Sequence, residues 1–116
     1  MANEVTMTAD QLHRAIDDAE RLFVNAGQMK VKAEGLDLRR KRVRAAMFVK
    51  HRANTKSAAE AEAMAESDPV YEMACVDWET AALEAETLRA QAEAKRMKFE
   101  AWRSANATKR AAMNIR

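Results

Sequence analysis

Residues 12–47 read LHRAIDDAERLFVNAGQMKVKAEGLDLRRKRVRAAM, and apolar residues recur along them at alternating steps of three and four. This period is typical of an amphipathic helix that packs against a second helix. The series covers five heptads, and its one charged member is Arg40. Its members are Leu12, Ala15, Ala19, Leu22, Ala26, Met29, Ala33, Leu36, Arg40, Val43 and Met47. The stretch predicts one long helix. A kink, if the helix has one, is expected at Gly35, because glycine weakens a helix by about 1 kcal/mol relative to alanine.

A second apolar series with the same period begins after Pro69. Its members are Tyr71, Ala74, Trp78, Ala81, Ala85, Leu88, Ala92, Lys95, Phe99 and Trp102, and it fades through Asn106 to Met113. Residues 57–66 are rich in alanine and glutamate and predict a short connecting helix. Helix-start signals precede all three segments, at Thr8 with Gln11, Ser57 with Glu60, and Asp68 with Pro69. We predict a single all-α domain over residues 1–116, with helices at residues 9–53, 57–66 and 69–113.

The composition supports this fold and limits the class of protein. Two glycines and one proline among 116 residues leave little turn chemistry, so no strands are expected. Only six residues are aromatic, which predicts a thin core lined by alanine. The chain has no apolar run long enough for a signal peptide or a membrane span, and its single cysteine, Cys75, cannot form an internal disulfide. We therefore expect a cytoplasmic protein without membrane contact.

Charged residues are arranged in blocks that predict an antiparallel hairpin of the two long helices. Residues 39–56 carry eight basic and no acidic side chains, and residues 57–86 carry nine acidic and no basic ones. Residues 87–116 are again basic, whereas residues 1–38 are mainly acidic. An antiparallel arrangement places each basic block beside an acidic one, and a parallel arrangement would place like charges together.

Two helices alone bury little surface, because each covers only one side of the other. We therefore expect a coiled-coil-like hairpin that dimerises into a four-helix bundle. A homodimer of this kind would cover the apolar residues beside the main series, which are Ile16, Phe23, Met73, Val76 and Leu83.

Catalytic and metal chemistry is not expected. His13 and Asp17 are one helical turn apart, but no third ligand completes a metal site. Cys75 has no base near it in sequence, so we interpret it as a small buried residue. The sequence also lacks a glycine-rich phosphate loop and a paired acid and base, so it predicts a non-enzymatic protein without a cofactor or a metal.

Two basic segments are candidates for binding a nucleic acid or a partner protein. The first lies within the run at residues 39–44, and the second combines an aromatic residue with basic and small polar residues. Their members are Arg39, Arg40, Lys41, Arg42, Arg44, Trp102, Arg103, Lys109 and Arg110. Each segment has an alternative interpretation. The first segment could instead pair with the acidic block at residues 57–86 of the same chain. Trp102 could instead pack on Leu12 or Ala15 at the end of the helix pair.

The C-terminal half of the chain resembles a family of small helical proteins encoded by tailed phages. The resemblance rests on Asp68-Pro69-Val70-Tyr71, the alanine- and glutamate-rich helix that follows, Phe99-x-x-Trp102-Arg103, and Thr108-Lys109-Arg110-Ala111-Ala112-Met113. Genes for such proteins often neighbour recombination and replication genes. The resemblance implies an early phage protein that handles single-stranded DNA or assists a recombinase, and it brings no catalytic residues.

Three functions follow from these features. The first is a dimeric accessory protein of phage DNA recombination or replication that binds single-stranded DNA or a DNA-bound enzyme. The second is an anti-defence protein, similar in role to an anti-CRISPR, that binds a host defence complex through an acidic surface that mimics phosphates. That surface would comprise Glu60, Glu62, Glu66, Asp68 and Glu72. The third is a structural coiled-coil spacer.

Overall fold

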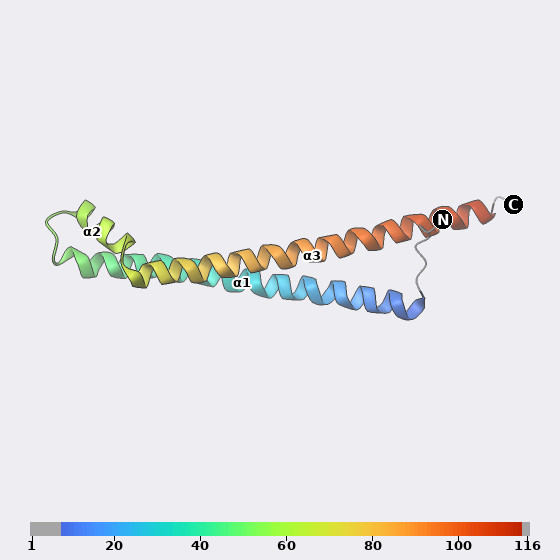
Figure 1. Cartoon of the computed structure of the whole chain (residues 1–116), viewed down its shortest axis with the longest axis horizontal. Helices are drawn as coiled ribbons and strands as arrows, with labels where there is room; N and C mark the ends of the chain where they lie inside the picture. The colour runs from blue at the N-terminus through green and yellow to red at the C-terminus, as the bar shows by residue number, and fades with distance from the viewer. Residues whose placement is uncertain (1–7, 115–116) are drawn as a thin grey trace. The chain divides into compact units, whose positions relative to one another are not determined.

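The computed structural model describes residues 8–114, which form three α-helices and no strand (Figure 1). Helix α1 spans Ala9–Arg52, α2 spans Ala58–Glu66 and α3 spans Pro69–Asn114. The predicted all-α architecture, two long helices with a short helix between them, is confirmed. Each predicted helix end lies within one residue of the observed end.

The capping signals at the starts of α1 and α2 form the hydrogen bonds that their sequences predict. The backbone N–H of Thr8 donates to Oε1 of Gln11 at 3.0 Å, and the N–H of Gln11 donates back to Oγ1 of Thr8 at 3.1 Å. The N–H of Glu60 donates to Oγ of Ser57 at 3.2 Å. Both helices therefore begin where side chains satisfy backbone donors that no helical carbonyl can reach.

Asp68 is the N-cap residue of α3, and its side chain also contacts α1. Its Oδ1 accepts from the backbone N–H of Val70 at 2.9 Å, as an N-cap does, and its Oδ2 lies 2.8 Å from Nε2 of His51. The Nζ of Lys50 lies 3.8 Å from the same oxygen. The Val70 N–H, followed by His51, lowers the pKa of the buried Asp68 carboxyl below its usual value.

The helices form two compact units. The first unit combines residues 8–26, which include the first part of α1, with residues 87–114 of α3, and the second contains residues 27–86. In the second unit, Lys30 and Glu86 line one pocket, Arg40 contacts Trp78, and His51 meets Asp68. Residue numbers thus rise along α1 as they fall along α3, so the predicted antiparallel arrangement is confirmed in this unit.

Alanine forms the core, as the composition predicts. All eleven members of the α1 series are buried or half-buried, and Lys95 is the one exposed member of the α3 series between Tyr71 and Trp102. Within residues 8–114 the buried apolar side chains are Ala26, Ala33, Ala61, Ala65, Ala74, Ala81 and Ala92. No large side chain of this range is fully buried. The alanines let the helices approach closely, and the larger side chains of the series cover the edges of the contact.

The two glycines of α1 offer a direct way to stabilise the protein. The helix continues through Gly27 and Gly35, neither has a positive φ, and a Cβ added at either position meets no atom within 4 Å. Each change to alanine is expected to stabilise the fold by about 1 kcal/mol, which raises the melting temperature by about 4–8 °C in a small domain. Thermal unfolding followed by circular dichroism measures this. An unchanged or lower melting temperature would contradict the prediction.

Candidate nucleic-acid interface

Arg40, the one charged member of the α1 series, is held between α1 and α3. Its Nη2 donates to Oδ1 of Asp37 at 2.6 Å, its Nη1 to the Tyr71 hydroxyl at 3.5 Å, and its guanidinium carbon lies 4.5 Å from the centre of the Trp78 ring. The side chain is only 23% exposed. A guanidinium in such a position requires an anion and hydrogen-bond acceptors, and these neighbours supply them. Arg40 is therefore part of the packing, and its hydrogen bond lowers the pKa of the Asp37 carboxyl.

The rest of the predicted basic run divides into bound and free side chains. The Nζ of Lys41 lies 3.4 Å from Oδ2 of Asp37, and Nη2 of Arg44 lies 2.7 Å from Oε1 of Glu66 in α2. Arg44 thus pairs with the acidic block of the same chain, and Lys50 does so through Asp68. Two members of the run are exposed and have no ion pair within residues 8–114: Arg39 and Arg42.

The predicted acidic surface is also partly occupied by the chain itself. Glu66 pairs with Arg44, Asp68 is buried against His51, and Glu60 accepts a hydrogen bond from the backbone N–H of Lys56. The two remaining carboxylates are exposed: Glu62 and Glu72. The five residues therefore do not form one uniformly free acidic surface.

The C-terminal part of α3 carries the densest group of free cations. Residues 95–110 contain six basic side chains and one acidic side chain. Arg96 is bound to Glu93 and Glu100, which lie one turn away on either side. The exposed cations without an ion pair within residues 8–114 are Lys95, Lys98, Arg103, Lys109 and Arg110. Their spacing along one helix gives this part of the first unit an excess of positive charge.

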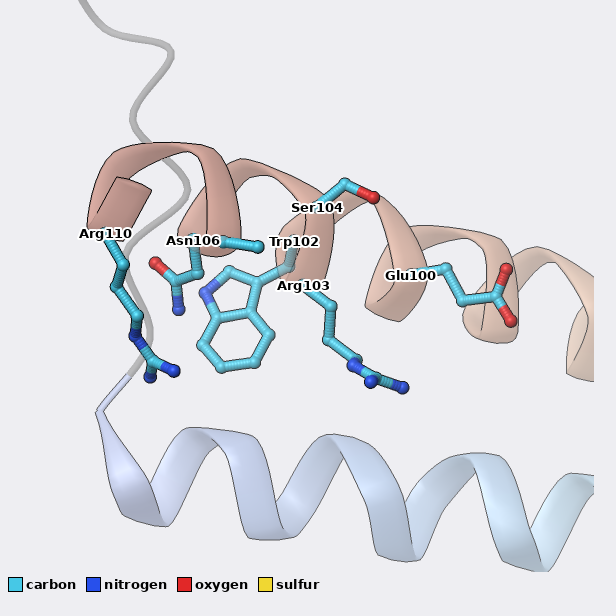
Figure 2. A pocket seen from close by; sticks show the side chains of 7 residues that line it. Glu100, Trp102, Arg103, Ser104, Asn106 and Arg110 are labelled. Atoms are coloured by element: carbon cyan, nitrogen blue, oxygen red, sulfur yellow. The ribbon is translucent and has the colours of Figure 1, made fainter. Parts of the chain in front are cut away.

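Trp102 stands at the centre of these cations, beside an open pocket of about 520 Å³. Figure 2 shows its indole on the side of α3 that faces α1, with Arg103 and Arg110 on either side of the ring. The indole Nε1 is buried and has no hydrogen-bond acceptor within residues 8–114. The Phe99 ring contacts the indole in a tilted arrangement, with ring centres 6.0 Å apart, and the Arg103 guanidinium carbon is 6.0 Å from the Phe99 centre. The residues that line the pocket are Glu100, Trp102, Arg103, Ser104, Asn106, Ala107 and Arg110.

The pocket thus brings together Trp102, Arg103 and Arg110 of the predicted binding segment. Lys109 lies outside its lining, and Asn106 joins it. The sequence pattern places Asn106 where the apolar series fades, and its position one turn beyond Trp102 on the same face of the helix is the signal that links it to the pocket. An amide at that position is polar enough to contact a ligand.

The other potential chemical groups are dispersed. No set of three or more His, Cys, Asp or Glu side chains in residues 8–114 is placed to hold a metal ion. Cys75 is half-buried, not fully buried as we expected, because it lies beside the α3 series and not in it. None of the three described helices contains an apolar stretch able to cross a membrane.

Low pH is expected to destabilise the fold. Contacts with cations or backbone N–H groups hold the pKa of Asp37, Asp68 and Glu93 below their usual values. Such groups stabilise the fold fully above their unfolded pKa, about 4, and this contribution is lost as the pH falls through the lower folded values. The urea midpoint should therefore fall between about pH 6 and pH 3. Asp68→Asn, which keeps a capping side chain, should show a smaller fall, and equal wild-type midpoints at the two pH values would contradict the prediction.

No family model, curated protein or solved structure matches the chain. A proposal for the function therefore rests on the side chains described above.

Proposed function

We propose that the protein is a non-enzymatic accessory protein of phage DNA recombination or replication, and that it binds single-stranded DNA through residues 95–110 of α3. The observation that carries this proposal is the group of free cations around the half-buried Trp102. Cations without an internal ion pair can neutralise phosphates and release their counterions, which favours binding to any sequence.

A single strand fits this surface better than a duplex. An indole beside a surface pocket can stack on a base only if that base is not already stacked between its neighbours, and a single strand meets this requirement. The run at residues 39–44 is a weaker candidate, because Arg40, Lys41 and Arg44 already contact Asp37 and Glu66. Breaking those contacts would oppose binding there.

Fluorescence anisotropy with a labelled single-stranded oligonucleotide, at several salt concentrations, tests the proposal. The double variant Lys98→Ala and Lys109→Ala should bind more weakly, and the slope of log K against log salt should become shallower by roughly 1.4, since each phosphate contact contributes about 0.7. The matched control is Arg39→Ala with Arg42→Ala, which removes two free cations of the other segment and should leave binding unchanged. The proposal would be overturned if the wild type did not bind at low salt. It would also be overturned if only the control variant lost affinity for the oligonucleotide.

We also propose that two copies associate into a four-helix bundle. The buried core of residues 8–114 consists of alanines, while Met73 and Val76 on α3 are 61% and 53% exposed. Covering these side chains would remove apolar surface from water. Light scattering should give twice the chain mass of 13.0 kDa. Met73→Glu with Val76→Glu should give the monomer mass with the helix content retained, and a monomeric wild type would contradict the dimer.

A further inference from the structure

The pocket beside Trp102 is lined mainly by hydrogen-bond donors. They are the guanidinium groups of Arg103 and Arg110 and the Asn106 amide, with the Trp102 indole beside them. The one carboxylate of the lining, Glu100, lies 3.4 Å from Nη1 of Arg96, which offsets its charge. A lining of this kind favours a ligand that carries anionic oxygen atoms.

The spacing of these groups further limits the class of ligand that fits the pocket. Arg103 and Arg110 are seven residues apart, which corresponds to roughly 10.5 Å along a helix. Figure 2 shows the indole between them, with its nitrogen on the side of Asn106. Two cations with an aromatic ring between them match a ligand that has an anion at each end and a flat ring in the middle. The pocket volume of about 520 Å³ is in the range of small-molecule sites.

We infer that this pocket is a subsite for one nucleotide of a single strand. The base lies against the Trp102 indole, and the phosphates on its two sides bind Arg103 and Arg110. The inference rests on the proposed function and deepens it, because it assigns part of the affinity to one base and not to charge alone. It also gives Asn106 a role, since its amide can donate to and accept from the edge of a base.

The buried indole nitrogen agrees with this assignment. A buried N–H without an acceptor is unfavourable, and native proteins contain few of them. Figure 2 shows the Asn106 amide on that side of the ring. A nucleotide in the pocket would supply acceptor atoms near this donor, either directly or by turning the Asn106 carbonyl toward it.

An oligothymidine and an abasic oligonucleotide of the same length separate base contacts from charge contacts. The wild-type protein should bind the oligothymidine at least about fivefold more tightly, the lower end of what stacking on one base provides. Trp102→Ala should remove this difference, and Trp102→Phe should restore most of it because a phenyl ring also stacks. Arg103→Ala or Arg110→Ala should weaken the binding of both oligonucleotides.

The outcomes distinguish this inference from the proposed function. Equal affinity of the wild type for the two oligonucleotides, or an unchanged preference in Trp102→Ala, would overturn the nucleotide subsite while DNA binding stands. No binding of either oligonucleotide would overturn both. Circular dichroism of each variant checks that the helices remain folded.

Discussion

Ala92→Asp is expected to unfold the first unit, formed by residues 8–26 and 87–114, at temperatures where the wild-type protein is folded. Ala92 is 0% exposed. A carboxylate at this position would lose its contact with water, which costs several kcal/mol. The total stability of a small domain is only about 5–15 kcal/mol, so one such change removes much of it. Thermal unfolding by circular dichroism and limited proteolysis measure the effect.

Ala94→Asp is the matched control for this change. Ala94 is exposed and lies two residues further along α3, so its substitution carries the same loss of helix propensity without burying a charge. It should unfold close to the wild-type temperature. If Ala92→Asp and Ala94→Asp unfold at the same temperature, then Ala92 is not part of a packed core.

Arg40→Glu is expected to destabilise the second unit, and the fall in melting temperature should exceed the rise produced by Gly35→Ala. The new carboxylate would lie beside Asp37, and the contacts with Tyr71 and Trp78 would be lost. Thermal unfolding followed by circular dichroism compares the variants. Arg40→Met should remain close to the wild type, because a packed apolar side chain often replaces a partly buried ion pair without loss.

Arg39→Glu serves as the control for Arg40→Glu. Arg39 is exposed and has no ion pair within residues 8–114, so the same reversal of charge should change stability little. A larger effect of Arg39→Glu than of Arg40→Glu would contradict a packing role for Arg40. The oligonucleotide affinity of Arg40→Met should also equal that of the wild type.

Features encoded by neighbouring residues could be predicted from the sequence. The three helix starts depend on a side chain and a backbone N–H within three residues of each other, at Thr8, Ser57 and Asp68. The series on α1 and α3 depends on a period of three and four residues, and burial follows that period. Only local chemistry is needed for these features.

Features that depend on distant residues could not be predicted in the same way. Arg40 was a candidate contact for DNA, and its role in packing depends on Tyr71 and Trp78, which are more than thirty residues away along the chain. The pairing of Arg44 with Glu66 was one of two readings that charge alone left open. The pocket at Trp102 depends on the directions of Arg103, Asn106 and Arg110, which a sequence pattern does not specify.

The two tryptophans allow a direct test of where DNA binds. Trp78→Phe leaves Trp102 as the only tryptophan, in the first unit, and Trp102→Phe leaves Trp78, beneath Arg40 in the second unit. Titration with oligothymidine at low salt should quench the fluorescence of Trp102 in the first variant and leave that of Trp78 in the second unchanged. Two results would contradict a DNA-binding surface centred on Trp102. One is quenching of Trp78 without quenching of Trp102, and the other is quenching of neither tryptophan.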